Sequence, residues 1–485
     1  MSLLTAMWTF PLAAAAFCLA AGRFGRSTAR AAALAVSIVY FALSLWLLRP
    51  FVASAGQAVL VVSGRPLAFG VSYLLSADGL SAALIALTAF LNLLCVLASW
   101  KLDVSAGYWA AFQALAAALA GVFLARDLFF FYVFWEATLI PMFFIVGIWG
   151  SDNRRHAAVK FFLFTFAGSI LMLLALIAAV VAHHGLTGVW TWDLKALLGT
   201  EFGAAAPWIF LGLVVGFGVK IPIVPLHTWL PDAHTEAPAA GSVMLAGVML
   251  KMGLYGLIRV AFPLLPGITV AWAPYMALVA GVGTVYGALC AMAQTDLKRL
   301  IAYSSIAHLG FCLLGLVSLT AVGLAGGSLQ MINHGITTGA LFFLVGFLYE
   351  RGHKRGLSDF GGLVKRAPVF SFFFGFAVFA SIGLPGLNGF VGEFMCLSGI
   401  AISQAPIYAV VGCVGVTLAA AYLLPAYQSV FWAPEGPGSV SDHVDDLDAR
   451  EKGILWTLCA LMLWIGLAPH AWLQVLEPSI RGLVK

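Results

Sequence analysis

Residues 216–256 read GFGVKIPIVPLHTWLPDAHTEAPAAGSVMLAGVMLKMGLYG, and this stretch decides how the rest of the chain is interpreted. Lys220 and Lys251 stand in apolar segments, and Pro222 and Pro225 lie between them. A lysine at the centre of a bilayer costs roughly 3 kcal/mol, so a lysine at that depth indicates a functional role. Proline removes a helical hydrogen bond, and broken backbone is tolerated in a membrane only where protein or a water-filled cavity surrounds it. A charge beside a broken helix therefore indicates an ion path.

The composition is that of a membrane protein. Of the 485 residues, 62% are hydrophobic and only 9% are charged, whereas soluble domains contain about 25% charged residues. A spanning helix needs about 20 apolar residues, and this length predicts an all-α polytopic membrane protein with about fourteen transmembrane helices. The predicted segments lie near residues 4–22, 31–48, 76–99, 106–124, 127–148, 157–182, 207–229, 238–262, 269–292, 300–319, 323–349, 368–402, 407–431 and 453–475.

Several classes of site and partner are not expected. The 7 cysteines lie in apolar runs and form no CxxC pair, so we expect neither an iron–sulfur cluster nor a metal site on this chain. Gly281, Gly283 and Gly287 approach a dinucleotide-binding pattern, but the third glycine is one place late and falls inside a predicted spanning helix. The basic residues lie in short loops between helices, so the net charge of +5 requires no nucleic-acid partner.

Two of the predicted helices are discontinuous. The seventh contains Pro222 and Pro225, and the twelfth, residues 368–402, is too long for one straight crossing and contains Pro385. The breaks and two Asp-Leu pairs recur at a similar offset, which indicates two five-helix repeats, inverted because five is odd. Inverted repeats with broken helices are typical of transporters. The predicted divisions are helices 1–3 (1–105), the first repeat (106–263), the second, inverted repeat (264–432), and an inside loop with helix 14 (433–485).

The distribution of Lys and Arg predicts the orientation. If the N-terminus lies outside, most basic residues fall in inside loops, among them Lys298, Arg299 and Arg351. Both termini then face the outer side, and the acidic run at residues 442–451 lies inside.

Six ionisable residues lie near the middle of predicted helices, and we take them as candidates for proton translocation. An isolated charge in a low-dielectric interior becomes neutral, whereas an opposite charge nearby keeps it ionised. We therefore interpret Glu136 and Lys220 as partners whose separation decides whether the lysine keeps its proton. Histidine suits the intermediate steps, because its ordinary pKa of about 6.5 lets it accept and donate protons near neutrality. The six are Glu136, Lys220, Lys251, His308, His334 and Glu393.

Structural roles compete with this interpretation. A single Glu–Lys pair can simply fix helix packing, and a single buried histidine is more often a satisfied core residue. Asp78, Asp127 and Asp296 read as helix caps. Lys160 can join the relay or extend its ammonium group to the inner face, and we expect the second.

His227, Asp232 and His234 border the inside loop after the seventh helix. They are candidates for proton entry from the inner side. They fit equally well a role in satisfying the backbone of the broken helix. The sequence leaves both interpretations open.

Four further motifs, together with the opening stretch, resemble the antiporter-like subunits of respiratory complex I. The resemblance runs from about residue 75 to about residue 430. Within that family, the L and N types and the related cation/proton antiporters usually carry lysine on the twelfth helix, whereas Glu393 is similar to the M type. The motifs are FYVFWEATLIPM at 131–142, YSSIAHLG at 303–310, NHG at 333–335 and GFVGEF at 389–394.

The resemblance implies one proton channel in the membrane arm of a proton-pumping NADH:quinone oxidoreductase. It implies that flavin, iron–sulfur clusters and the quinone site belong to partner subunits, that L-type and N-type subunits are neighbours, and that the membrane is a bacterial inner membrane. It assigns the switching pair to Glu136 and Lys220, the central relay to Lys251, the next steps to His308 and His334, and the terminal acid to Glu393.

Two other functions stay open. A subunit of a multi-chain sodium/proton antiporter, or of a membrane-bound hydrogenase, would share this fold, and the co-purifying subunits would distinguish it. A structural scaffold would need the buried lysines only for packing. It predicts that Lys220→Ala or Lys251→Ala harms assembly but not pumping in the complex that still assembles.

Overall fold

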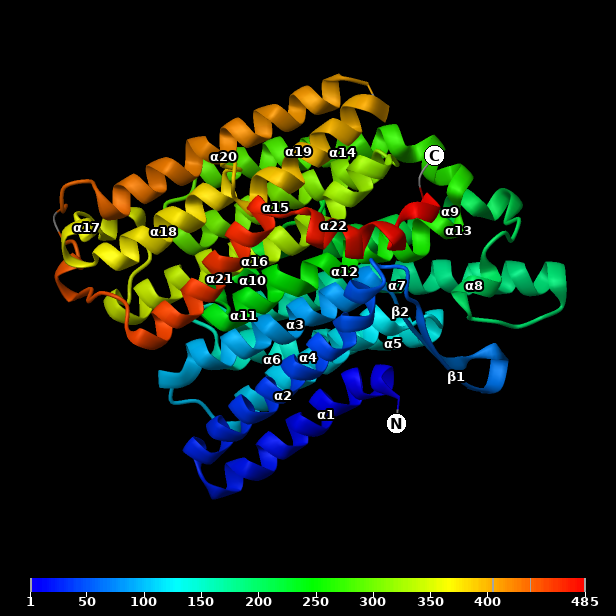
Figure 1. Cartoon of the computed structure of the whole chain (residues 1–485), viewed down its shortest axis with the longest axis horizontal. Coiled ribbons are helices and arrows are strands. Elements are labelled where there is room, and N and C mark those ends of the chain that lie inside the picture. Colours follow the sequence, from blue (N-terminus) through cyan, green and yellow to red (C-terminus); the bar gives the residue numbers. More distant parts are fainter. Residues whose placement is uncertain (1, 404, 437, 484–485) are drawn as a thin grey trace.

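The chain folds into a bundle of long helices that lie roughly alongside one another (Figure 1). This computed structural model describes residues 2–403, 405–436 and 438–483. Within those ranges 12 helices are long and apolar enough to cross a membrane, or 13 if a pair bent by 84° near the C-terminus counts as one span. The α-helices are α1 (Leu3–Ala21), α2 (Arg26–Ala53), α3 (Gly79–Ala98), α4 (Ala106–Leu124), α5 (Leu128–Ala137), α6 (Leu139–Trp149), α7 (Arg154–Thr187), α8 (Leu194–Leu197), α9 (Ala206–Lys220), α10 (Trp229–Glu236), α11 (Ala239–Met244), α12 (Leu250–Gly256), α13 (Phe262–Leu264), α14 (Pro266–Met292), α15 (Leu297–Val317), α16 (Ala321–Gly352), α17 (Leu363–Arg366), α18 (Pro368–Ser381), α19 (Asn388–Ser403), α20 (Ile407–Phe431), α21 (Ala449–Leu467) and α22 (His470–Leu476).

The prediction of a polytopic helical membrane protein is confirmed in this coarser form. The predicted twelfth segment, residues 368–402, differs from a single span because it consists of two shorter helices, α18 and α19. Residues 382–387, which include Pro385, separate them.

A small antiparallel hairpin takes the place of the start of the predicted third helix. β1 (Leu60–Pro66) pairs with β2 (Ser72–Ala77), and α3 begins at Gly79 rather than at residue 76. The Asp78 carboxylate accepts a hydrogen bond from Ser81 N at 3.0 Å and so caps α3, as predicted. The predicted start is wrong because hydropathy does not distinguish a short apolar strand from the first turn of a helix.

Besides the bent pair near the C-terminus, three spans are interrupted in the described ranges, and proline accounts for part of each of these interruptions. Between α5 and α6 the helix is broken at Thr138, where Pro141 supplies no N–H to the carbonyl group of Ala137. Between α9 and α10 the break contains Pro222 and Pro225. The first interruption adds to the two expected from the sequence, and it lies directly after Glu136.

The span that contains Lys251 is continuous but not uniformly α-helical. A π-helical turn, Leu245–Met249, joins α11 to α12, and a second, Leu257–Ala261, joins α12 to α13. Such turns occur frequently at functional sites, because the wider ring reorients the neighbouring side chains and carbonyl groups. Lys251 thus lies on a short α-helical segment between two widened turns.

The helices that carry the central polar residues are surrounded by protein. α16 is almost entirely buried and α15 nearly so, whereas α1, α2 and α20 lie at opposite edges of the bundle and expose much of their surface (Figure 1). A charge on α15 or α16 therefore faces other protein groups rather than lipid.

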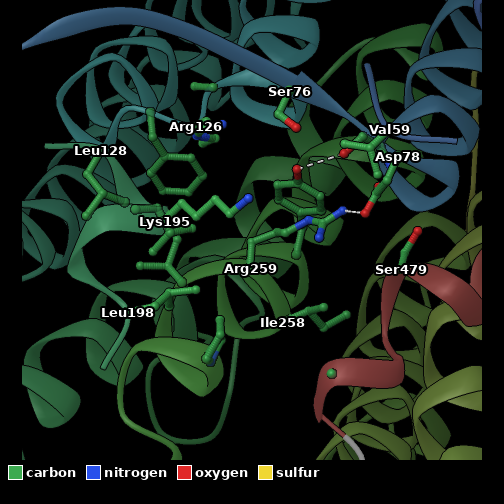
Figure 2. A pocket seen from close by; sticks show the side chains of 18 of the residues that line it. Val59, Ser76, Asp78, Arg126, Leu128, Lys195, Leu198, Ile258, Arg259 and Ser479 are labelled. Carbon is green, nitrogen blue, oxygen red and sulfur yellow. Dashed lines mark hydrogen bonds and ion pairs between the residues drawn. The ribbon is translucent and has the colours of Figure 1, made fainter. Parts of the chain in front are cut away.

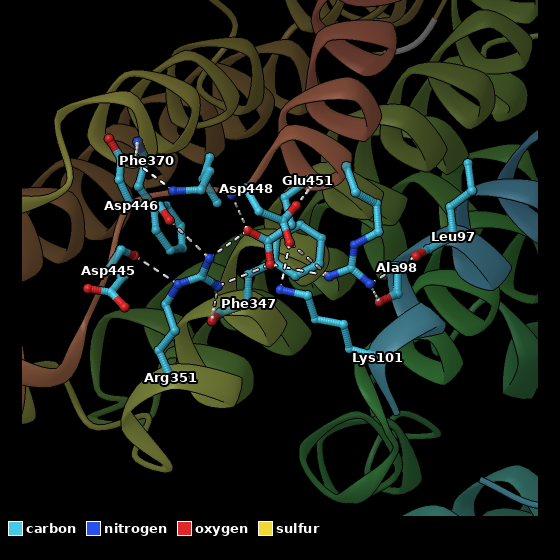
Figure 3. Close-up of polar contacts among 12 residues, drawn as sticks. Leu97, Ala98, Lys101, Phe347, Arg351, Phe370, Asp445, Asp446, Asp448 and Glu451 are labelled. Atoms are coloured by element: carbon cyan, nitrogen blue, oxygen red, sulfur yellow. Dashed lines mark hydrogen bonds and ion pairs between the residues drawn. The ribbon is translucent and has the colours of Figure 1, made fainter. Parts of the chain in front are cut away.

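An ion-pair network joins distant parts of the chain at the end of the bundle that the sequence places inside (Figure 3). Lys101, after α3, lies 2.8 Å from Asp448, which precedes α21. Arg351, near the end of α16, lies 2.6 Å from the buried Glu451. The network therefore fixes α21 against both α3 and α16.

Candidate functional site

Lys251 and His334 are in direct contact at the centre of the bundle. Lys251 Nζ lies 2.6 Å from His334 Nδ1 and also donates a hydrogen bond to the carbonyl oxygen of Ala246. Ala246 belongs to the first π-helical turn, which brings its carbonyl group within reach of the ammonium group. Both side chains are buried, so protons can pass between them without bulk solvent.

The polar contacts continue from His334 to Glu393. The ring centres of His334 and His308 are 6.0 Å apart. His308 Nδ1 lies 3.2 Å from Glu393 Oε1, and its Nε2 lies 3.3 Å from the hydroxyl oxygen of Ser381. Each imidazole can accept a proton on one ring nitrogen and release one from the other, so this row of groups can conduct protons.

Neutral polar side chains surround the Glu393 end of the row. Gln330 Nε2 donates to Glu393 Oε1 at 3.4 Å, and Asn333 Nδ2 donates to the carbonyl oxygen of Asn388 at 2.8 Å. A cavity of about 10 Å³ lies between His308 and these groups. That volume is about what one water molecule requires, and one water would shorten the step between the two histidines.

The spacing of polar residues on α16 predicts these amide side chains, which a search for charged residues alone does not find. Gln330, Asn333 and Thr337 recur at three- and four-residue spacing, with His334 beside them. Residues at that spacing share one face of a helix. A search for neutral polar residues on an apolar helix, rather than for ionisable ones only, would have included them.

The partly buried Glu136 and the buried Lys220 lie near each other but do not form an ion pair. Neither Glu136 Oε1 nor Lys220 Nζ has a hydrogen-bond partner among the described residues. The ammonium group instead lies 5.9 Å from the ring centre of Trp135 and 5.4 Å from that of Phe161. Aromatic faces attract a cation, so they hold Lys220 while the two charges still interact across the gap.

Four of the six predicted residues therefore form one row, and the other two form a separate pair. The row runs from Lys251 on α12 through α16 and α15 to α19. The pair lies on α5 and α9, each at the end of a helix beside a break. Broken helix ends bring unpaired backbone groups to the same place, so the pair has polar surroundings that a straight helix would not provide.

The two histidines proposed for proton entry face different neighbours. His227 lies in the break after α9, and its ring centre is 5.2 Å from that of Tyr286 on α14. His234, on α10, stacks on Phe342 of α16 at 4.7 Å, and neither ring nitrogen has a partner among the described residues. The structure does not bring these two side chains into contact.

Asp232, the third of those candidates, is paired with Lys160. Asp232 Oδ2 lies 2.5 Å from Lys160 Nζ, and both side chains are partly exposed. The lysine thus has a carboxylate partner on α10, and the expectation that it extends to the inner face stays a prediction. Hydropathy does not reveal this contact, because the contact joins two oppositely charged residues, Lys160 and Asp232, on different helices.

Lys298 belongs to a helix, and its assignment to an inside loop is wrong. Asp296 caps α15, accepting a hydrogen bond from Lys298 N at 2.8 Å, so the helix already includes this lysine. Its side chain is buried, and its ammonium group donates to the carbonyl oxygen of Ala237. It lines a cavity of about 520 Å³ with Glu236. Asp296 could have indicated that Lys298 is helical, because a capping residue marks where a helix begins.

The comparisons with known proteins identify the family to which the chain belongs. The family described as "NADH:quinone oxidoreductase/Mrp antiporter, TM" matches residues 125–419. The chain is 39% identical to NADH-quinone oxidoreductase subunit M of Rhodobacter capsulatus, over 100% of this chain and 96% of that protein. It is also 39% identical to subunit M of Escherichia coli K12, over 86% of this chain and 83% of that protein.

Solved structures share the fold over nearly the whole chain. A chain of respiratory complex I from Thermus thermophilus with bound NADH has a TM-score of 0.89 and 32% identity, covering 99% of this chain and 100% of that one. A chain of the Mrp complex from Dietzia sp. has a TM-score of 0.87 at 21% identity, covering 100% and 98%, and so shares the fold alone. The chain therefore belongs to the NADH:quinone oxidoreductase/Mrp antiporter transmembrane family, as a subunit of the M type.

Proposed function

We propose that this chain moves protons across the membrane through the row Lys251, His334, His308 and Glu393. The observation that carries the proposal is the row of polar contacts, 2.6 Å at the lysine end and 3.2 Å at the glutamate end, with one step between the two histidines that no direct hydrogen bond spans. The middle step of 6.0 Å between ring centres has a cavity beside it that fits one water. Every group in the row can both take up and release a proton.

Glu136 and Lys220 act as the switch that loads this row. When the carboxylate approaches, its charge stabilises the lysine ammonium; when it moves away, burial favours the neutral amine, which releases its proton toward Lys251. The separated pair and the unpartnered Lys220 Nζ correspond to the releasing arrangement. Redox chemistry in partner subunits moves Glu136. The cysteines of this chain form no CxxC pair of the kind that holds an iron–sulfur cluster.

We infer the partner subunits and the membrane from the family, and the orientation from the distribution of Lys and Arg. The partners are other membrane-arm subunits of complex I, with L-type and N-type subunits as neighbours and with flavin, iron–sulfur clusters and quinone on partner chains. The membrane is a bacterial inner membrane, and both termini face its outer side. We also propose fourteen spans with two inverted five-helix repeats, in which α9–α10 and α18–α19 are corresponding broken helices that each form one crossing.

Glu136→Gln in the assembled complex tests the switch. The amide keeps the size of the side chain but has no charge, so NADH-driven proton transport should fall roughly tenfold or more. Transport is measured in inverted membrane vesicles together with the amount of assembled complex. Glu435→Gln, a change at a partly exposed loop residue, is the matched control. Normal transport in Glu136→Gln would refute its role.

The mass-spectrometric subunit list of the purified native complex tests the setting. Flavin and iron–sulfur subunits should co-purify with this chain. A set of antiporter or hydrogenase subunits in their place would assign it to one of those related complexes instead.

A further inference from the structure

A second, separate cavity opens at the opposite end of the Lys251 helix (Figure 2). It has a volume of about 400 Å³ and lies where α3 and α5 begin, beside the C-terminal residues 479–483. Under the proposed orientation, this end faces the outer side of the membrane. Its lining combines apolar residues with Ser81, Tyr255 and Arg259, and none of these three belongs to the row described above.

Three polar residues on one helix connect this cavity to the central row. Lys251, Tyr255 and Arg259 follow one another at intervals of four residues, so they lie along the same side of the helix. Four residues correspond to a rise of about 6 Å. Lys251 is in the central row and Tyr255 is in the cavity wall, so a single helical turn separates the two.

The Tyr255 hydroxyl group is already part of a hydrogen-bonded chain. It donates to the carbonyl oxygen of Phe123 at 2.8 Å, and it lies 3.0 Å from the hydroxyl oxygen of Ser81. Tyr255 and Ser81 are both buried, yet both line the cavity. The hydroxyl pair therefore stands between the protein interior and the cavity.

The charges that line the cavity are largely neutralised. Arg259 pairs with Asp78, as Figure 2 shows. Arg126 makes two hydrogen bonds to Asp193, at 2.7 and 2.5 Å. The two guanidinium groups are paired, and the third positive side chain of the lining, Lys195, lies at the exposed mouth, so little positive field remains deeper in the cavity to repel an excess proton.

We propose that this cavity is the outer passage through which protons carried by the row Lys251, His334, His308 and Glu393 leave at its Lys251 end, with Tyr255 and Ser81 as the gate. This inference rests on the proposed function of Lys251. In the outward direction, the Lys251 ammonium gives its proton to an intervening water and becomes the neutral amine. The Tyr255 hydroxyl group turns from the carbonyl oxygen of Phe123 toward Ser81, and the water protonates the Tyr255 oxygen as the hydroxyl proton of Tyr255 passes to Ser81. Ser81 in turn gives its own proton to water in the cavity, so each hydroxyl ends as it began.

Thiol labelling tests whether the gate is open to the outer medium. Ser81→Cys in the full complex is treated with a membrane-impermeant, positively charged thiol reagent, on spheroplasts and on inverted vesicles. We expect modification from the outer side only, with loss of NADH-driven proton transport. Lys195→Cys at the exposed mouth is the control that must be labelled, and Thr88→Cys, buried further along α3, is the control that must not be. The unaltered chain, with its native cysteines, gives the background.

Tyr255→Phe tests the hydroxyl itself, because the ring is kept. Proton transport should fall roughly tenfold or more, while NADH oxidation by an artificial electron acceptor and the thermal midpoint stay unchanged. Tyr40→Phe is the matched control, since the hydroxyl group of Tyr40 is buried and has no partner among the described residues. Normal transport in Tyr255→Phe, or an unlabelled Ser81→Cys beside a labelled Lys195→Cys, would overturn the proposal.

The two proposals fail separately. If Glu136→Gln abolishes transport but Tyr255→Phe does not, the central relay stands and the outer passage is wrong. If labelled Ser81→Cys blocks transport while Glu136→Gln leaves it normal, the passage stands and the switch is wrong.

Discussion

Lys251 has two contacts that respond differently to its charge. The carbonyl oxygen of Ala246 can only accept a hydrogen bond, whereas His334 Nδ1 can either accept a proton or, once protonated, donate one. The carbonyl group thus keeps the ammonium group in place, and the histidine offers it an exit. A side chain here must carry charge and also be able to lose it.

Lys251→Arg separates these two requirements. Arginine keeps the positive charge but does not lose its proton in proteins, so NADH-driven proton transport should fall roughly tenfold or more although a cation is still present. Lys354→Arg, an exposed position near the end of α16, should leave transport unchanged. Near-normal transport in assembled Lys251→Arg complexes would show that the charge alone matters.

Glu393→Gln examines the other end of the row. The amide oxygen can still accept the hydrogen bonds from His308 and Gln330, so packing should be preserved. The amide cannot carry a proton, so transport should fall by a similar factor while the amount of complex stays the same. Glu201→Gln, at an exposed position, serves as the comparison. A drop in assembly rather than in transport would make Glu393 a packing residue.

At this scale the sequence predicted which residues matter better than how they meet. Charged residues in apolar segments stand out because burial makes them unfavourable without a partner. Nothing local to either residue, however, indicates that Lys251 contacts His334 while Lys220 stays apart from Glu136, because those contacts depend on how whole helices pack. The same limit hid Lys298, whose burial depends on the start of α15.

At the scale of elements, the α9–α12 contact depends on glycines of α12, and Gly253 is the one that meets the backbone of α9. A Cβ atom at Gly253 would lie 2.6 Å from the carbonyl oxygen of Phe217 and 2.5 Å from Ile221 Cγ1. Real Cβ atoms do not approach backbone oxygen so closely, so α12 would have to move away from α9. Gly253 therefore allows the helix carrying Lys251 to pack against the one carrying Lys220.

Gly253→Ala should destabilise the protein by about 1–3 kcal/mol through this overlap. It should also reduce proton transport, because the two lysines move apart. Gly283→Ala on α14 is the control, since a Cβ atom there meets nothing within 4 Å. The readouts are the thermal midpoint of the purified complex and transport in vesicles. Equal midpoints for the two variants would contradict the proposed contact.

Helix breaks were partly predictable. Pro222, Pro225 and Pro385 correctly marked two of them, because proline cannot complete the helical ladder. The break at Thr138 was not predicted, although Pro141 supplies no N–H to the carbonyl group of Ala137, directly before it. The π-helical turns carry no proline and cause no gap in hydropathy, so nothing in the composition of that span reveals them.

At the scale of the whole molecule, Asp448 connects the first and last parts of the chain. Its Oδ1 accepts a hydrogen bond from Glu451 N at 2.8 Å and caps α21, and its Oδ2 lies 2.8 Å from Lys101 Nζ. Burial alone would raise the pKa of Asp448. The Lys101 ammonium and the backbone N–H of Glu451 together lower it by more than that, so the pKa lies below its ordinary value of 3.8. The folded state therefore favours the carboxylate.

Asp448→Ala should lower the free energy of unfolding by about 1 kcal/mol at neutral pH. Because the folded pKa lies below the unfolded one, this contribution is complete above the unfolded value and is lost as the pH falls through the folded value. The difference in thermal midpoint from the unaltered protein should therefore disappear in acid. Asp445→Ala, whose side chain is exposed, should show little difference at any pH. A gap that persisted in acid would mean that the charge contributes nothing.

The overall architecture was predictable because lipid leaves few choices. A long apolar segment must satisfy its backbone internally and so becomes a helix, and this reasoning found nearly every span. The hairpin β1–β2 and the network around Asp448 lie at or beyond the ends of the long apolar helices, where that constraint does not apply. Their arrangement depends on pairs of residues far apart in sequence, such as Lys101 and Asp448.

The two π-helical turns make the Lys251 helix longer than its path requires. Each widened turn holds one residue beyond the regular α-helical count, so removing one residue from Leu245–Met249 would restore ordinary helix rather than break it. The helix on either side of the deletion would keep its register, but the carbonyl group of Ala246 would return to a regular helical hydrogen bond and would no longer be available to Lys251. The number of residues in this helix, and not side-chain identity alone, thus determines which groups the Lys251 amine contacts.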